Sequence, residues 1–460
     1  MLISFSVENF RSFYEEQTLE MSATTRAGAG HDNHCQKTSE GIRLLPLAVL
    51  YGANGAGKSN LIKAMRYAAW MVLEGPRPGK PTAREAFGNP GNDQPSGFDF
   101  RFLARNHIFR YGFRVTDTQV ESEWLLVVLD GKEQVIYERT TSPEGKIIIE
   151  CGHLLNQEAE LQHSQVLAFA GFVSASGRIN QLFLHSIHEN LDERAQGDWV
   201  GAALSWFSKS LTIIDPGEHF PALQRSLTIS PDFSEFASRY LKSVSTGVEK
   251  LINVRTPDMP LERAREMIPM GLASNLTEAD FNGPVIADFT LPDGSMMALS
   301  RGDSGGYFVH TIATTHQGVD EKPFELPLSA ESDGTRRLLH LLPAIYPKTV
   351  GGEVVVIDEI DRSLHPILTR QFVEEFLKLA PDSKRQLVLT THDTVLLDLE
   401  LLRRDEIWFV EKNQASATSL YSLSDFPVRK DLRINKGYLQ GRFGGIPFLG
   451  GFEKLAETAP

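Results

Sequence analysis

The fold is decided by the stretch LLPLAVLYGANGAGKSNLIKAMRY, residues 44–67. Its first part is an apolar run with the length of a buried strand, and its last part has apolar residues at helical spacing. Between them GANGAGKS, residues 52–59, fits the G-x-x-x-x-G-K-S pattern of a phosphate-binding loop in full. A glycine-rich turn that opens a helix lets the backbone wrap around phosphates, which the free helix amides attract. The sequence therefore predicts a nucleotide site at this turn.

Each part of the loop has an expected role. The ammonium group of Lys58 would reach the β and γ phosphates of ATP, and the Ser59 hydroxyl group would bind Mg²⁺. A glycine turn without a ligand is the alternative, but a chance match in a strand–turn–helix context is rare. The loop residues that we expect to bind the nucleotide are Gly52, Asn54, Gly55, Ala56, Gly57, Lys58 and Ser59.

A second apolar run, EVVVIDE at residues 353–359, ends in two carboxylates. Residues 354–357 predict a strand buried on both faces, as in a parallel sheet. Asp358 would hold Mg²⁺, directly or through water, and Glu359 would polarise the water that attacks in hydrolysis. The alternative is that these carboxylates only end a strand in a solvated turn. Because residues 60–352 separate the two motifs, a large insertion must divide one sheet into two halves.

A third apolar run, LVLTTHD at residues 387–393, ends in polar residues with His392 at its tip. The carboxyl ends of adjacent parallel strands share one crevice, so His392 could contact the γ phosphate. Alone, a histidine at a strand end is more often an ordinary surface residue. Its place after a strand that ends in carboxylates favours the functional role.

Between these motifs, AESDGTRRLLHLLPAIY at residues 330–346 predicts an apolar helix that begins near Ser332. A helix cap explains part of this pattern, because Ser332 or Asp333 would accept hydrogen bonds from the first helix amides. The order of the four elements gives a second interpretation. Phosphate loop, Ser-x-Gly helix, Asp-Glu strand and His-tipped strand resemble the head of ABC-type ATPases, the class of the SMC, RecF and OLD proteins.

This resemblance implies ATP and Mg²⁺ as ligands and a site completed by two subunits. In that class the signature serine and glycine meet the γ phosphate bound to the other subunit, and Ser332 and Gly334 match those positions. A head-to-head homodimer follows, from which larger rings could be built. The sequence ESDGTRR departs from the Leu-Ser-Gly-Gly-Gln of transporters. Arg11 follows the first strand where related heads contact the nucleotide, although a surface role is the alternative.

The segments SFSVENFRSF, residues 4–13, and YLQGRFGGIP, residues 438–447, resemble bacterial phage-defence ATPases of the RloA/AbiLi type, which are related to PtuA and the PARIS ATPase. The resemblance implies a slow, regulatory ATPase that acts as a switch or sensor with a separately encoded effector, such as a Toprim-type nuclease. Only 68 residues follow His392, too few for an appended Toprim domain. A RecF- or SMC-like ATPase of DNA repair or maintenance is the alternative, although no long heptad run supports SMC.

We expect an α/β fold: an ABC-type ATPase head with a mixed or parallel core sheet, an antiparallel β lobe and a mainly helical insertion. The ATPase core would comprise residues 1–75 and 325–460, the lobe 76–175, and the insertion with returning strands 176–324. Asp-Gly pairs at residues 130–131 and 293–294 predict hairpin turns.

Composition limits the partners and the compartment. The net charge is −13, so any contact with DNA must use a local basic patch. There is no run of 18 uninterrupted apolar residues, so we expect no membrane span. The chain has only two cysteines and no signal-peptide pattern, which favours a cytoplasmic protein.

Overall fold

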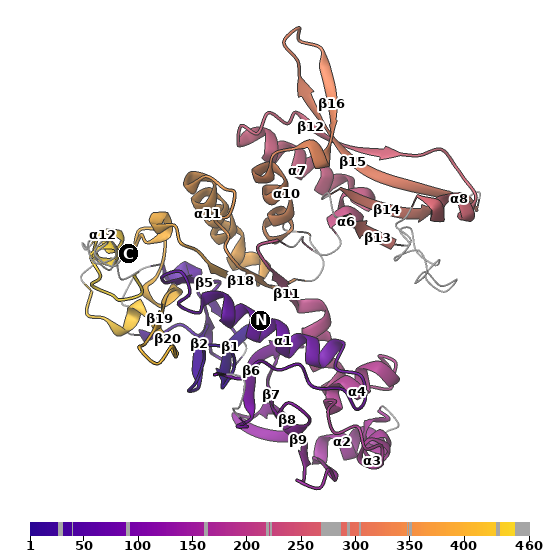
Figure 1. Ribbon diagram of the computed structural model, residues 1–460, viewed down its shortest axis with the longest axis vertical. Coiled ribbons are helices and arrows are strands. Elements are labelled where there is room, and N and C mark those ends of the chain that lie inside the picture. Colours follow the sequence, from indigo (N-terminus) through magenta and orange to yellow (C-terminus); the bar gives the residue numbers. More distant parts are fainter. Residues whose placement is uncertain are drawn as a thin grey trace, which may run out of the picture. The chain divides into compact units, whose positions relative to one another are not determined.

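The chain folds into two compact units, which are described separately. The first comprises Met1–Ile213, Gly351–Ile360 and Leu377–Pro460, and the second comprises Ile214–Val350 and Asp361–Phe376. The computed structural model (Figure 1) describes residues 1–25, 31–38, 40–88, 93–160, 164–217, 220, 223–267, 287–291, 295–302, 305–346, 348, 352–428 and 433–446.

The first unit contains a six-stranded sheet in the order β11-β17-β18-β5-β19-β20. Its strands are β5 (Leu47–Tyr51), β11 (Leu211–Ile214), β17 (Val354–Ile357), β18 (Gln386–Thr390), β19 (Ile407–Lys412) and β20 (Thr418–Ser422). Four of them, β17, β18, β5 and β19, are parallel neighbours, whereas β20 is antiparallel to β19. All residues of β5, β17 and β18 are buried, as expected inside a parallel sheet. The three predicted apolar runs are therefore adjacent strands.

The same unit contains a seven-stranded sheet in the order β10-β9-β8-β7-β6-β1-β2. Its strands are β1 (Leu2–Glu8), β2 (Gln17–Glu20), β6 (Ser96–Ala104), β7 (His107–Val115), β8 (Val120–Leu129), β9 (Lys132–Thr141) and β10 (Ile147–Cys151). All its pairs are antiparallel. Asp130 and Gly131 connect β8 to β9 with φ of 51° and 73°, which agrees with the predicted hairpin. β1 and β2 belong to this sheet, although the sequence grouped them with the ATPase core.

Helix α1 (Lys58–Leu73) contributes to one hydrophobic core with both sheets. Its buried residues Leu61 and Met65 share this core with Phe100 of the antiparallel sheet and with Leu50 and Val356 of the parallel sheet. Other helices in the described part of the unit include α2 (His153–Glu160), α3 (Val166–Ala175), α4 (Phe183–Asn190), α5 (Gly197–Ser205) and α12 (Ile434–Leu439). Strand β3 (Gln36–Lys37) pairs with β4 (Arg43–Leu44).

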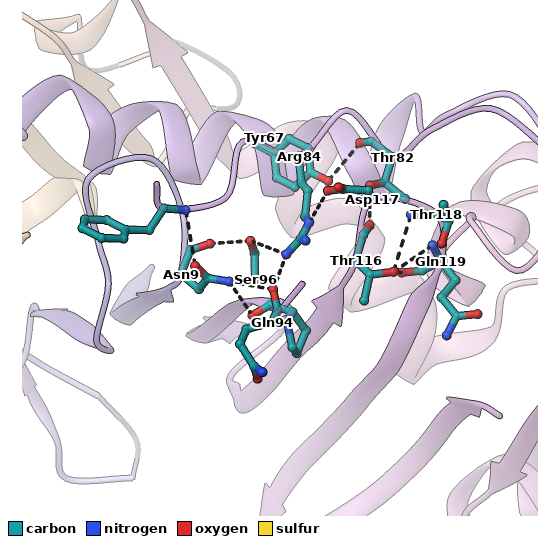
Figure 2. A network of polar contacts seen from close by, with 12 residues as sticks. Asn9, Tyr67, Thr82, Arg84, Gln94, Ser96, Thr116, Asp117, Thr118 and Gln119 are labelled. Atoms are coloured by element: carbon teal, nitrogen blue, oxygen red, sulfur yellow. Dashed lines mark hydrogen bonds and ion pairs between the residues drawn. The ribbon is translucent and has the colours of Figure 1, made fainter. Parts of the chain in front are cut away.

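A polar network fixes part of the segment between α1 and β6. Figure 2 shows the guanidinium group of Arg84 at its centre. Arg84 Nε donates to Asp117 Oδ1 at 2.5 Å, and its Nη1 donates to the Gln94 carbonyl group. Asn9 Nδ2 donates to the same carbonyl group at 2.6 Å, and Ser96 Oγ donates to the Asn9 carbonyl group at 2.5 Å. The segment is therefore tied to the end of β1.

The second unit is built on an antiparallel sheet in the order β12-β15-β14-β13, with β16 paired to β15. Its strands are β12 (Lys250–Arg255), β13 (Ala287–Thr290), β14 (Met296–Arg301), β15 (Tyr307–Gln317) and β16 (Pro323–Pro327). Its helices are α6 (Leu223–Ile229), α7 (Pro231–Ser243), α8 (Leu261–Glu266), α10 (Asp333–Ile345) and the first part of α11 (Pro366–Ser383). The Asp-Gly pair at residues 293–294 lies outside the described residues.

The predicted fold class is confirmed. The structure combines an α/β head, whose sheet is mostly parallel, with an antiparallel lobe and an inserted region of helices and returning strands. The domain bounds predicted at residues 75, 175 and 324 stay a prediction.

Candidate functional site

The phosphate-binding loop connects the end of β5 to the start of α1. Gly55 and Gly57 have φ of 78° and 117°, a left-handed backbone that favours glycine. Gly57 is the N-cap of α1, and no side chain caps this helix. Free amides and the positive end of the helix dipole at such an N-terminus favour an anion. The loop therefore has the geometry that the sequence motif predicts.

Lys58 is the first residue of α1, and its surface is 5% exposed. Its Nζ donates to the carbonyl oxygen of Gly52 at 2.7 Å and to that of Ala53 at 3.2 Å. The ammonium group is thus held against the loop backbone and does not extend into solvent. A positive charge at this position suits a phosphate ligand.

The two carboxylates at the end of β17 have different environments. Asp358 is 2% exposed, and its Oδ1 accepts a hydrogen bond of 2.5 Å from Thr390 Oγ1 at the end of β18. Glu359 is partly exposed, and its φ of 48° is uncommon for a residue with a side chain. Its amide donates to Thr390 Oγ1 at 2.8 Å, and the Ile360 amide donates to the Thr390 carbonyl group at 3.0 Å. The neighbouring strand therefore fixes the turn that presents Glu359.

A pocket of about 290 Å³ brings most of the predicted residues together. It lies in the first unit, over the phosphate-binding loop. Glu359 and the exposed His392 line it from the ends of two neighbouring strands, as the crevice argument predicts. The other lining residues are Asn54, Gly55, Ala56, Gly57, Lys58, Ser59 and Asn60. Asp358 and Gly52 are buried and do not line the pocket.

Arg11, another predicted nucleotide contact, does not line this pocket either. Its Nη2 donates to Glu85 Oε1 at 2.5 Å, and its amide donates to the Glu85 carbonyl group at 2.6 Å. Its φ of 52° shows that the turn after β1 is tight. The surface role that the sequence left open is therefore the one that the geometry favours, and the nucleotide contact stays a prediction.

Ser332 and Gly334 belong to the second unit. Ser332 is the N-cap of α10, and its Oγ accepts a hydrogen bond of 3.1 Å from the Thr335 amide, so the predicted cap is present. A Cβ added to Gly334 would lie 2.8 Å from the carbonyl oxygen of Ser363. The helix start and the segment after the carboxylates thus touch within one unit. The role in trans stays a prediction.

Two residues of the site were missed in the sequence. Asn60 lines the pocket from the first turn of α1, and Thr390 holds both Asp358 and the Glu359 amide. The signal for Asn60 was its place directly after the GANGAGKS motif. The signal for Thr390 was its place among the polar residues at the end of a buried strand. Neither signal distinguishes such a residue from its polar neighbours.

The comparison with known families supports the nucleotide site. Residues 47–398, well over half of the chain, match the family described as "AAA domain, putative AbiEii toxin, Type IV TA system". The matched range begins at β5 and ends just after the His392 strand, so it contains the loop and both strand ends. The chain belongs to this AAA-domain family. It is therefore a P-loop ATPase by class.

The comparison with solved structures finds SMC heads. The SMC head domain from Thermotoga maritima has 12% sequence identity and a TM-score of 0.37, and the match covers 92% of this chain and 98% of that chain. An SmcHead bound to the C-winged helix domain of ScpA has 14% identity and a TM-score of 0.37, with 92% and 97% covered. No curated protein was found to match this AAA-domain chain. In the described residues, no helix has both the length and the apolar character that a membrane span needs.

The donor set of this AAA-domain site fits Mg²⁺. Ser59 lines the pocket with a hydroxyl group, and the carboxylate of Asp358 is buried beside the pocket-lining Glu359, at the end of β17. Mg²⁺ prefers oxygen ligands and in nucleotide sites is held by one or two protein groups together with phosphates and water. A site with few protein ligands is therefore what a nucleotide-bound Mg²⁺ requires.

Proposed function

We propose that this chain binds and hydrolyses ATP as a switch or sensor subunit of a bacterial anti-phage defence system, together with a separately encoded effector. The observation that carries the ATPase part is the pocket in which the phosphate-binding loop faces Glu359 and His392. Phosphoryl transfer depends mainly on positioning and on stabilisation of charge, and this pocket offers both.

Each residue has a proposed part in the reaction. The loop amides and Lys58 bind the β and γ phosphates and offset their charge. Glu359 orients the attacking water and takes its proton, and His392 donates a hydrogen bond to the γ phosphate. Ser59 and Asp358 would hold Mg²⁺, which neutralises phosphate charge when bound. Thr390 fixes the turn of Glu359, so that the carboxylate approaches the pocket at a defined position.

The site is proposed to be complete only in a dimer. Ser332 and Gly334 would contact the γ phosphate bound to a second copy of the chain, face to face with the first. The exposed N-terminus of α10, where Ser332 and Asp333 lie at the surface, supports this proposal. Two heads would then close around ATP and separate after hydrolysis, which gives a switch. Rings built from such dimers are an extension of the same proposal.

The defence role rests on the resemblance of residues 4–13 and 438–447 to the RloA/AbiLi type and on the description of the matched family, which names a toxin of a type IV TA system. The proposed effector is a separate protein, such as a Toprim-type nuclease. Contact with DNA would use local basic patches, because the chain carries a net charge of −13. We place the protein in the cytoplasm.

The test compares Lys58→Ala with Lys63→Ala, an exposed lysine on the same helix. Purified parent and Lys63→Ala should bind ATP and hydrolyse it slowly with Mg²⁺, whereas Lys58→Ala should lose binding. In cells that carry the neighbouring genes, plaque counts should rise only with Lys58→Ala. Absence of ATP binding by the parent would contradict the ATPase proposal, and unchanged plaque counts with Lys58→Ala would contradict the defence role.

A further inference from the structure

Three segments that are far apart in the sequence meet at the phosphate-binding loop. Ser12 lies in the turn after β1, Asn60 in the first turn of α1, and Thr418 at the start of β20. Asn60 Nδ2 donates to Ser12 Oγ at 2.8 Å, and the hydroxyl oxygens of Ser12 and Thr418 are 2.7 Å apart. Thr418 Oγ1 also lies 2.8 Å from the carbonyl oxygen of Ala56, inside the loop.

The number of available protons fixes which group donates in each of these hydrogen bonds. A hydroxyl group carries a single proton, and a carbonyl oxygen can only accept. Thr418 must therefore donate to the Ala56 carbonyl group, which leaves the Ser12 hydroxyl group to donate to Thr418. Asn60 in turn donates to Ser12. The chain of donors runs Asn60, Ser12, Thr418, Ala56, and each hydroxyl oxygen both accepts and donates.

The fit around Thr418 is tight as well as polar. Thr418 is 2% exposed and Ser12 is 6% exposed. A Cβ added to Gly57 would lie 2.3 Å from Thr418 Oγ1 and 2.9 Å from Ser12 Oγ. The Thr418 amide also donates to the Ser12 carbonyl group at 2.7 Å, so the backbones of the two segments are held together. The loop backbone at Gly57 therefore packs directly against the two hydroxyl groups.

We propose that Thr418, supported by Ser12, is a positioning residue that fixes the Ala56–Gly57 peptide of the phosphate-binding loop. A trans peptide is planar, and its C=O and N–H groups point in opposite directions. A hydrogen bond that holds the Ala56 carbonyl group thus also sets the direction of the Gly57 N–H group. Because Ala56 and Gly57 line the nucleotide pocket, this direction decides how well the loop receives a phosphate. The inference rests on the proposed ATP binding.

The alternative is that Thr418 only ties β20 to the rest of the unit. Thr418→Val separates the two roles, because it removes the hydroxyl group and keeps the shape. Thr418→Ser keeps the hydroxyl group, and Ser419→Ala removes a hydroxyl group from an exposed position on the same strand. A positioning role changes nucleotide affinity, whereas a purely structural role changes only the unfolding temperature.

The experiment measures the Kd of ATP with Mg²⁺ by calorimetry, and thermal unfolding without nucleotide, for the full chain and its variants. We expect Thr418→Val to weaken affinity about tenfold, the equivalent of one net hydrogen bond. Thr418→Ser and Ser419→Ala should bind ATP like the parent. Parental affinity in Thr418→Val, or equal losses in Thr418→Val and Thr418→Ser, would overturn the inference.

Ser12→Ala gives a second, independent test, also where Thr418→Val does not fold. It removes the donor to Thr418 and should weaken ATP affinity in the same direction. The double variant with Thr418→Val should lose less than the sum of the two single effects, because both act through one chain. Parental affinity in Ser12→Ala, or full additivity, would contradict the proposal. A parent that does not bind ATP would instead refute the proposed function, which the Lys58→Ala comparison detects separately.

Discussion

The hydroxyl group of Thr390 donates a hydrogen bond of 2.5 Å to Asp358 Oδ1, across the parallel pair β18 and β17. The same oxygen accepts the Glu359 amide at 2.8 Å. One side chain thus orients the proposed Mg²⁺ ligand and the turn that carries the proposed general base. This relationship links two carboxylates that the sequence places side by side but cannot orient.

Thr390→Val should lower ATP turnover at least tenfold and raise the Mg²⁺ concentration that turnover requires. Valine cannot donate to the buried carboxylate, and the loss of such a bond costs about 1–3 kcal/mol. Turnover is measured against Mg²⁺ concentration, with Thr390→Ser as the variant that keeps the donor. Parental turnover and Mg²⁺ dependence in Thr390→Val would show that the bond is not needed.

Glu359→Gln should keep ATP binding and lose turnover by about 10²- to 10⁴-fold, because an amide cannot accept the proton of the attacking water. Phosphate release under single-turnover conditions, together with the Kd of ATP, separates the two effects. Glu353→Gln is the matched control, because Glu353 directly precedes β17 and so lies at the opposite end of this strand from Glu359. If Glu359→Gln hydrolyses ATP at the parental rate, Glu359 is not the base.

Substitutions of Arg11 and Glu85 test whether Arg11 contacts the nucleotide, although the structure pairs its guanidinium group with Glu85. If Arg11 binds ATP, Arg11→Ala should weaken ATP affinity about tenfold, the loss of one charge-assisted hydrogen bond. Glu85→Ala should leave affinity unchanged or strengthen it, because it releases the guanidinium group. The measurement is the Kd of ATP for both variants. Equal, parental affinities would reduce Arg11 to its surface pair with Glu85.

Ser332→Arg should fold and bind ATP but hydrolyse it poorly, because it places bulk and charge at the proposed dimer interface. The loss of the cap itself costs only about 0.5–2 kcal/mol of stability. Mixed with Lys58→Ala under conditions where subunits exchange, it should recover partial turnover, since one composite site then has an intact loop and an intact signature helix. Parental turnover of Ser332→Arg alone would leave the helix cap as its only role.

Glu123→Gln should destabilise the antiparallel lobe by about 1–3 kcal/mol, because its amide group faces hydrogen-bond donors. The buried carboxylate accepts bonds from the amides of Phe183 and Leu184 at 2.5 and 2.9 Å and from the Tyr137 hydroxyl group at 2.8 Å. Burial raises the pKa of Glu123, and the charge of Arg139 opposes that shift.

Thermal and denaturant unfolding check this effect against Glu121→Gln, an exposed glutamate on the same strand. The control should unfold like the parent. If both variants have parental stability, the donors around Glu123 are satisfied in another way.

Local patterns in the sequence determined the elements of the ATPase head. An apolar run of strand length before GANGAGKS predicts a buried strand, and the glycines at residues 55 and 57 fit the positive φ values that the loop adopts. The apolar runs at residues 354–357 and 387–390 are strands for the same reason, and polar residues at their ends lie at one edge because parallel strands share a direction. Glu359, His392 and the loop were predictable to this extent.

Tertiary structure alone decided which side chains meet. Thr418 and Ser12 are 406 residues apart, and Thr390 and Asp358 are 32 residues apart, yet each pair shares a hydrogen bond. Nor did any periodicity show that β1 joins the antiparallel sheet or that Arg84 and Asn9 donate to the same Gln94 carbonyl group. Periodicity reports which face of an element is buried, whereas the partner of a polar side chain depends on strand order and register. Strand order and register follow from the packing of the whole unit around α1. The local sequence therefore determined the elements of the site, whereas tertiary packing determined the geometry of the site.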